Sequence, residues 1–432
     1  MMETELEKYF DRLWPICRSI TGNGLRESFK ILKEIIPLQL SEIPTGTKVF
    51  DWEIPMEWNI NDAYIITPNG DKICDFKINN LHVLNYSIAV NKEIEYSELE
   101  KHLFSLPNLP AAIPYLTSYY KKNWGFCISH NEKEKLSRKG IYKVFIDSTL
   151  KNGSLTYGDV VLKGESEKEI LFSSYLCHPS MANNELSGPL CLAFLYNKIV
   201  KIPNRKYTYR FVLAPETIGT IAYLKNNNEI LSKNLIGGYI ITCCGDRGVF
   251  NYKMSKNENS IIDRVAKHIL KYSNLNHNII PFSVGGSDER QYCSPGFNFS
   301  VGSLMRTPYQ QFKEYHNSLD NKSFISFNSL IDTIEVYFKF VELLEINDYL
   351  FNNIQFCEPQ LGKRGLYPNK LEPDFNREEL HRLLHLLSFS NGKNDLIYIA
   401  EKRNELALNF KYSIDKCINQ NLLLIHNKIG YN

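Results

Sequence analysis

The sequence lacks the features of several protein classes. No apolar run among its 432 residues approaches the roughly 20 residues that a membrane-spanning helix needs. Its first eight residues, MMETELEK, are acidic and follow a helical pattern, unlike a secretory signal peptide. The 50 Lys and Arg residues nearly balance the 48 Asp and Glu residues, and a net charge of +2 gives no electrostatic argument for binding nucleic acid or a membrane. We therefore expect no membrane partner.

The sequence also lacks the cysteine spacing that indicates disulfide bonds or a cysteine-based metal site. The ten cysteines are scattered, with no CxxC pair and no dense framework. Those at positions 177, 191, 243 and 244 fall in apolar patterns, where a reduced cysteine behaves as a small hydrophobic residue. This usage predicts a reducing, cytoplasmic location. We find no internal repeat and no low-complexity segment.

What the sequence does contain is an ordinary globular composition, 43% hydrophobic and 23% charged, over a length that favours two or three domains. Residues 3–36 carry apolar side chains at helical spacing, interrupted at 19–24, which predicts two helices. From residue 47 to 129, strand-like runs at 48–52, 63–67 and 84–89 alternate with turns. We interpret this stretch as an inserted β-rich domain, because the α/β pattern resumes only after it.

The resumed pattern predicts the main sheet. Runs at 142–147 and 157–162 flank Asn152-Gly153, which predicts a β-hairpin. Strands are expected at 169–177, 207–214, 236–243 and 297–304, and helices at 186–200, 218–231, 259–272 and 323–346. Strands that alternate with helices at this spacing predict an α/β fold with a mostly parallel sheet and helices on both faces.

The pattern changes again after residue 348. Helices expected at 376–389, 394–403 and 407–420 precede an apolar run at 422–425, which suits a winged helix-turn-helix domain. Residues 350–432 carry 11 Lys and Arg against 9 Asp and Glu, and the helix at 407–420 has only Lys411 and Lys416, offset by Asp415. DNA-binding helices usually concentrate positive charge. The balance argues against DNA binding and favours a packing or oligomerisation module, and it leaves a homo-oligomer open.

Polar groups that could carry chemistry follow the predicted core strands. One such loop is common in any fold, and a helix-capping loop with a bystander histidine would look similar. Four loops that converge on His, Glu, Asp and His instead indicate a metal site at the carboxyl ends of the strands, with donors that suit Zn²⁺. The candidates are His178 with Asn184 and Glu185, then Glu216, then Asp246, and finally His316.

These groups resemble, in order and spacing, the zinc aminopeptidase-like fold of leucyl aminopeptidases, glutamate carboxypeptidases and glutaminyl cyclases. The whole chain more closely resembles a bacterial group of aminopeptidase-like proteins with an inserted β domain and a C-terminal winged helix, often associated with polysaccharide biosynthesis genes. The resemblance rests on the segments LCHPS (176–180), PETIG (215–219), GDRG (245–248), GSDERQY (286–292) and YHNSLD (315–320), and on DWEIP (51–55) and NWGFC (123–127) in the insert.

The resemblance implies roles for individual residues. His178 and Asp246 would be ligands of one zinc ion, His316 would bind a second, and Glu216 would be the general base that activates metal-bound water. Two positions depart from the family pattern. Asn184 occupies the position of a bridging aspartate, and Thr217 that of a second glutamate.

These two departures predict one zinc ion rather than two. An asparagine offers one neutral carbonyl oxygen where a carboxylate offers two charged oxygens. Asn184 and Glu185 remain candidate ligands, since Glu185 could replace the missing carboxylate. Glu216 could alternatively be a ligand rather than the base.

Arg290, Arg247 and Arg306 lie near the same loops and could grip a substrate carboxylate or phosphate, although a structural salt bridge to Asp288 or Glu289 explains an arginine equally well. Tyr315 and Tyr292 could donate to an oxyanion or pack in the core. We count Arg290, Arg247 and Tyr315 as candidate substrate-binding residues.

The sequence therefore predicts an aminopeptidase-like α/β domain at 1–46 and 130–347, an inserted β-rich domain at 47–129 and a winged helix at 348–432. The predicted function is metal-dependent hydrolysis of an amide or related bond in a small peptide-like or sugar-linked substrate. A catalytically silent protein of the same fold that binds a ligand or partner is one alternative, favoured by Asn184 and Thr217. A zinc-assisted acyl transferase or cyclase is another, because fold alone does not separate these activities.

Overall fold

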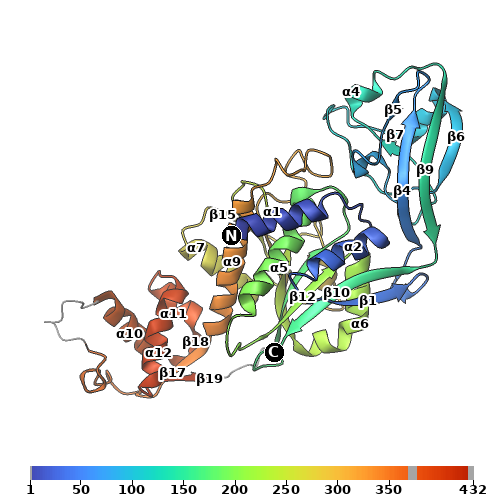
Figure 1. The fold of residues 1–432 in the computed structure, drawn as a ribbon. Coiled ribbons are helices and arrows are strands. Elements are labelled where there is room, and N and C mark those ends of the chain that lie inside the picture. Colours follow the sequence, from blue (N-terminus) through green and yellow to red (C-terminus); the bar gives the residue numbers. More distant parts are fainter. Residues whose placement is uncertain (1, 368–376, 427–432) are drawn as a thin grey trace. The chain divides into compact units, whose positions relative to one another are not determined.

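The computed structural model describes residues 2–367 and 377–426, and its chain forms two compact units (Figure 1). The first comprises Met1–Ile262 with Asn278–Glu335, and the second Asp263–His277 with Val336–Asn432. Each is described by itself below. In the described residues no helix combines the length and the apolar character needed to cross a membrane. None of the ten cysteines, all of which lie within the described residues, forms a disulfide bond.

An eight-stranded sheet with the order β1-β10-β12-β11-β13-β16-β14-β15 organises the first unit, with β15 (His277–Ile280) at one edge. Its central strands, β12 (Thr208–Ala214), β11 (Glu169–Tyr175), β13 (Leu235–Ile241) and β16 (Val301–Met305), run parallel. Antiparallel strands flank them: β1 (Gln39–Pro44), β10 (Ser154–Leu162) and β14 (Phe250–Lys253). Every residue of β11 and β12 is buried, which agrees with the short apolar runs at 170–172 and 211–214. The predicted mostly parallel sheet is confirmed.

Helices cover both faces of this sheet. Leu171 on β11 packs into one core cluster with Ile218 and Ile221 of α6 (Ile218–Asn234). Ser174, on the opposite face of the same strand, lies against Gly188 in α5 (Ser187–Ile199), where any side chain larger than hydrogen would collide with it. α1 (Met2–Leu13) and α2 (Asn23–Leu32) precede the first strand, as predicted from the helical spacing at 3–36 (Figure 1).

The inserted segment builds a separate four-stranded antiparallel sheet, β5-β4-β9-β6. Its strands are β4 (Glu57–Ile66), β5 (Lys72–Ile73), β6 (Val90–Glu95) and β9 (Ile141–Lys151). β9 therefore belongs to the insert's sheet although it follows the predicted boundary at residue 129. The hairpin predicted around Asn152-Gly153 is wrong. β9 pairs with β4 and β6, whereas β10 pairs with β1 and β12, so the chain crosses from one sheet to the other at this point.

Two other strand predictions in the insert need correction. The run at 48–52 is a hairpin of two short strands, β2 (Lys48–Val49) and β3 (Trp52–Glu53). The run at 84–89 is irregular, because its backbone pairs with loops instead of a strand: Asn85 N–H donates to Leu116 O, and Asn85 O accepts from Ser118 N–H, at 2.9 Å each. Tyr86 there has φ 73°.

The second unit contains the predicted C-terminal elements. α10 (Arg377–Phe389), α11 (Leu396–Lys402) and α12 (Lys411–Asn419) accompany a three-stranded antiparallel sheet of order β18-β17-β19. These strands are β17 (Tyr349–Asn352), β18 (Asn391–Asp395) and β19 (Leu423–His426). Residue 376, the predicted start of the first helix, lies outside the described residues. α7 (Ile261–Tyr272) and α9 (Phe327–Ile346) match the helices expected at 259–272 and 323–346.

Candidate active site

The first feature of the site is the way His178 is held. β11 ends at Tyr175, and the chain then forms a π-helical turn, Ala182–Leu186, directly before α5. This turn returns Glu185 to the histidine, so that Oε2 lies 2.9 Å from His178 Nδ1, and Oε1 accepts a 2.8 Å hydrogen bond from the backbone of Cys177. A carboxylate at Nδ1 orients the ring and leaves Nε2 for other contacts.

A buried arginine stands behind this pair. Arg18 is fully buried, and its Nε lies 3.6 Å from Glu185 Oε1 and donates a 3.1 Å hydrogen bond to the carbonyl of His178. Its Nη1 donates to Leu13 O at 2.7 Å. Arg18 lies just before the break predicted at 19–24, in the segment that joins α1 and α2, and it contacts both residues of the His178–Glu185 pair.

Cys177, His178 and Glu185 form the one group of three or more His, Cys, Asp or Glu donors, within the described ranges, whose atoms all lie within 4.8 Å of one another. This group does not suit a cation. Cys177 Sγ and Glu185 both face the same His178 nitrogen, at 3.5 and 2.9 Å, and the Arg18 guanidinium already balances the carboxylate. Burial also raises the pKa of the Cys177 thiol to about 11, so the thiolate that binds metals is disfavoured.

The opposite nitrogen of His178 faces Glu216. Its Nε2 lies 3.7 Å from Glu216 Oε2, and Glu216 Oε1 accepts a 2.8 Å hydrogen bond from Ser287 Oγ. Burial raises the pKa of Glu216, against the opposing effects of His178, Ser287 and Arg290. Glu216 sits between β12 and α6, so the strand end and the helix start aim it at His178.

Thr217, the next residue, has φ 64° and ψ −78°, an uncommon backbone conformation at the N-terminus of α6. Its N–H donates to Asp288 Oδ1 at 2.8 Å, and Thr220 Oγ1 donates to Asp288 Oδ2 at 2.8 Å. Asp288 therefore caps this helix start. Burial, with the nearby Glu216 charge, raises the pKa of Asp288 to about 8.

His316 completes the histidine pair. Its ring centre lies 5.3 Å from that of His178, and the ring stacks on Tyr315 at 4.0 Å with an interplanar angle of 9°. Its carbonyl accepts a 2.8 Å hydrogen bond from Tyr115 N–H, and its φ is 56°. Burial and the neighbouring His178 lower the pKa of His316 to about 3, so the ring is neutral and has a lone pair to offer a metal.

One pocket of about 610 Å³ joins these groups. His178, Glu216 and His316 line it together with Arg290 and Thr217, and the insert adds a wall of aromatic side chains. Arg290 Nη2 donates to Thr217 Oγ1 at 3.2 Å, while its Nε is buried without a hydrogen-bond partner among the described residues. We name this space the catalytic pocket, after the function proposed for it below. The aromatic residues that line it are Trp52, Tyr115, Tyr119 and Tyr120.

Asp246 lies outside this pocket and is engaged elsewhere. Its Oδ1 accepts from Gly248 N–H and Thr307 Oγ1, both at 2.7 Å, and its Oδ2 accepts from Asn183 Nδ2 at 2.9 Å and Thr307 N–H at 3.0 Å. Each carboxylate oxygen therefore has two protein donors, which fills its ordinary acceptor capacity. A metal at Asp246 would have to displace at least one of them. Its role as a ligand stays a prediction.

Asn184 and Glu185, the two further candidate ligands beside His178, are both buried in protein contacts. Asn184 Oδ1 accepts a 2.9 Å hydrogen bond from the Tyr175 hydroxyl, and its N–H donates to Asp320 Oδ2 at 2.9 Å. Glu185, the predicted substitute carboxylate, lies on the Nδ1 side of His178, away from the Glu216 contact. As placed, neither side chain lines the catalytic pocket.

Of the predicted substrate-binding residues, only Arg290 lines the catalytic pocket. Arg247 is exposed, and Tyr315 packs on the ring of His316. Sequence reasoning missed Arg18, Tyr115 and Trp52. A lone charged residue beside a predicted break gives no sign of burial, and the sequence analysis gave the aromatic residues of the insert no role at the site. The DWEIP segment was the one available signal for Trp52.

The comparisons with known proteins agree with this architecture. Residues 7–347 match a family described as a domain of unknown function (DUF4910), and residues 349–424 match a winged helix-turn-helix family. A Clostridium acetobutylicum protein, provisionally named a polysaccharide biosynthesis protein with an aminopeptidase-like domain, is 43% identical over 420 residues, covering 97% of this chain and 96% of that protein.

Solved structures extend the comparison. A crystal structure from C. acetobutylicum, provisionally described as a peptidase, has a TM-score of 0.92 at 42% identity, covering 98% of this chain and 96% of the other. A zinc aminopeptidase from Bacillus subtilis shares the fold, with a TM-score of 0.55 at 10% identity over 79% of this chain and 93% of its own. The chain therefore belongs to the family described as DUF4910, with an aminopeptidase-like fold and a C-terminal winged helix.

Proposed function

We propose that this chain is a metal-dependent hydrolase of the aminopeptidase type, acting with one zinc ion on an amide or related bond of a small peptide-like or sugar-linked substrate. The observation that carries the proposal is the position of His178. Glu185 occupies its Nδ1, so its Nε2 faces Glu216 at 3.7 Å in a pocket that His316 and Arg290 also line.

The donors of this pocket suit zinc. His178 and His316 bring two imidazoles to the pocket, a donor type common in catalytic zinc sites, and a carboxylate bonded to the far nitrogen, as Glu185 is to Nδ1 of His178, usually supports such a ligand. Glu216 Oε2 lies 3.7 Å from His178 Nε2, which places the proposed base beside the nitrogen that would bind the ion. Within the described residues, Cys177, His178 and Glu185 are the one group of three donors whose atoms all lie within 4.8 Å, so a bound ion requires the pocket side chains to move closer together.

Each residue has a defined task in this proposal. A bound zinc would lower the pKa of water and polarise the scissile carbonyl. Glu216, held by Ser287, takes the proton from water and returns it to the leaving amine. Arg290 binds an anionic group of the substrate, and Glu185 with Arg18 keeps the His178 ring in place.

The test measures zinc and hydrolysis separately. Purified protein should contain about one zinc per chain by mass spectrometry and should cleave aminoacyl p-nitroanilides. Glu216→Gln should keep zinc and lose hydrolysis, whereas loss of zinc from this variant would make Glu216 a ligand. Metal-free protein that resists zinc reconstitution would overturn the proposal. Glu335→Gln, at a surface pair with Lys198, is the matched control.

The second candidate function is a catalytically silent ligand-binding protein. One observation favours it: the position of the bridging carboxylate holds Asn184, whose oxygen is already used by Tyr175. Asn184→Asp separates the candidates. If wild-type protein binds no zinc and the variant does, the native chain has lost its metal site and binds ligands without hydrolysing them.

A further inference from the structure

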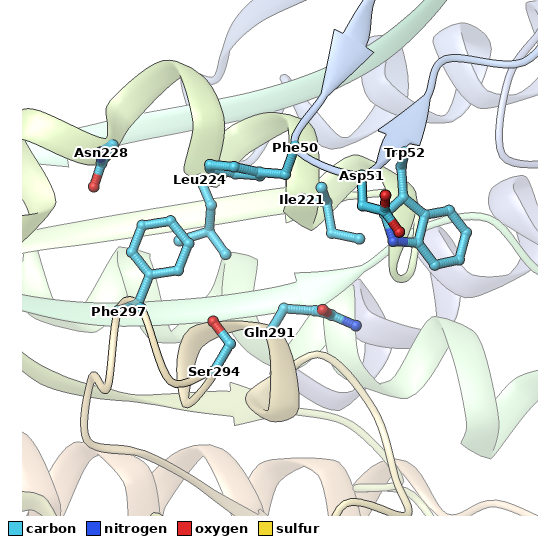
Figure 2. Close-up of a pocket in the computed structure, with 10 residues that line it drawn as sticks. Phe50, Asp51, Trp52, Ile221, Leu224, Asn228, Gln291, Ser294 and Phe297 are labelled. Atoms are coloured by element: carbon cyan, nitrogen blue, oxygen red, sulfur yellow. The ribbon is translucent and has the colours of Figure 1, made fainter.

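A second pocket, of about 390 Å³, adjoins the catalytic pocket. Phe50, Asp51 and Trp52 form one side of it, at the turn between β2 and β3, and Gln291 and Phe297 lie on the other (Figure 2). We name it the aromatic pocket. Trp52 lines both pockets, so the aromatic pocket lies beside the pocket that holds Glu216.

The aromatic pocket exposes flat apolar rings. Phe50 is 51% and Trp52 43% exposed, and Phe50 meets Phe297 edge-to-face with ring centres 5.7 Å apart. Aromatic rings exposed together in a concave site indicate a binding surface, since isolated exposed rings would not line a cavity. The DWEIP segment, which the catalytic residues leave unexplained, supplies this wall.

Polar groups stand at the same end of the pocket. Figure 2 shows the amide end of Gln291 turned toward the Asp51–Trp52 side. Asp51 and Gln291 both line the pocket, and neither residue is buried, so both side chains can bond to a ligand there. A ligand that packs on the Trp52 indole could therefore donate hydrogen bonds to the Asp51 carboxylate and exchange them with the Gln291 amide.

We propose that the aromatic pocket binds a pyranose ring of the substrate. A pyranose presents an apolar C–H face that packs on an aromatic ring, and hydroxyl groups at its edge that bond to a carboxylate and an amide. A wholly apolar side chain would match the rings and leave Asp51 and Gln291 without partners. This inference rests on the proposed function, because it makes the substrate an amide attached to a sugar, with the sugar on Trp52 and the amide at Glu216.

Saturation-transfer NMR on the full chain tests the subsite without hydrolysis. The probes are glucose, galactose, mannose, N-acetylglucosamine and N-acetylgalactosamine at millimolar concentration, with phenylalaninamide as the apolar competitor class. We expect transfer to the ring C–H protons of at least one sugar. Trp52→Ala should weaken that binding about tenfold or more, as should Asp51→Asn, which keeps the side-chain shape.

The outcomes separate the subsite from the catalytic proposal. Phe356→Ala, which removes a 90% exposed ring that lines neither pocket, should leave sugar binding unchanged. Binding of phenylalaninamide alone, binding of no probe, or sugar binding unaffected by Trp52→Ala would each overturn the inference. If the sugar binds through Trp52 while the protein holds no zinc, the subsite stands and the proposed hydrolase fails.

Discussion

The Nδ1 atom of His178 lies 2.9 Å from Oε2 of Glu185, and both side chains are buried. Because Glu185 holds Nδ1, the ring of His178 is oriented with its Nε2 facing the catalytic pocket, where that nitrogen could bind a metal. The pair is seven residues apart in the sequence and joined by one π-helical turn, so the loop that carries the histidine also carries its support.

Replacing Glu185 with Gln should weaken zinc binding. The variant keeps an oxygen for the Nδ1 hydrogen bond and loses the charge that makes the imidazole a stronger ligand, and changes of this kind typically lower metal affinity about 10–100-fold. Competition with a chromophoric chelator measures the apparent dissociation constant. Glu335→Gln removes an exposed charge and should leave that constant unchanged. Equal affinities of the Glu185→Gln variant and the wild type would contradict this role.

The buried Arg18–Glu185 ion pair should contribute far more to stability than the exposed Arg12–Glu34 pair, although the charged atoms of the exposed pair lie closer together. Arg18→Met leaves the fully buried Glu185 carboxylate without its cation, and breaking a buried pair in this way costs about 3–5 kcal/mol. Arg12→Met breaks a 2.6 Å pair with Glu34 at the surface and should change the free energy of unfolding little. Urea titrations of both variants make the comparison, and similar effects would show that Arg18 is not stabilising the site.

The parts of the fold that sequence reasoning predicted are those with strong local patterns. The apolar runs of β11 and β12 are completely buried, so their strands and the adjoining polar loops could be located from the sequence. The Arg18 contact to His178 joins residues 160 positions apart, and no local pattern encodes it. The residues Asn152-Gly153 suit a hairpin turn, yet β9 and β10 belong to two different sheets and do not pair with each other.

The Arg26–Glu57 pair predicts a pH dependence of stability. Both Glu57 oxygens face the guanidinium, at 3.0 and 2.5 Å, and hydrogen bonding to Arg26 lowers the pKa of Glu57 from 4.5 to about 2, against the effect of burial. Because the folded state holds the proton less tightly, this stabilisation is complete above pH 4.5 and is lost as the pH falls toward 2.

Unfolding free energies of wild type and Glu57→Gln, measured across this range, should therefore converge as the pH falls. The difference between the two proteins isolates Glu57 from the other carboxylates that titrate in the same window. A constant difference from pH 6 to pH 2, roughly the window set by ordinary and lowered carboxyl pKa values, would exclude the Arg26 pair as its cause.

Asp246 has two candidate roles: a zinc ligand, as the family resemblance implies, or a structural hydrogen-bond acceptor, as its contacts suggest. Its four protein donors come from Gly248, Thr307 and Asn183, and they tie together three loops near the strand ends. Asp246→Asn turns an NH₂ group toward some of these donors, so we expect the variant to lose about 1–3 kcal/mol of stability while it keeps its zinc content.

Thr307→Val is the matched variant for this test, because it removes one of those donors and leaves the carboxylate in place. It should lower stability in the same direction and likewise leave zinc unchanged. Zinc analysis and urea unfolding on both variants give the answer. If a folded Asp246→Asn protein has lost its zinc while the Thr307→Val protein retains it, Asp246 is a metal ligand. At least one of the present hydrogen bonds of Asp246 would then have to break when the ion binds.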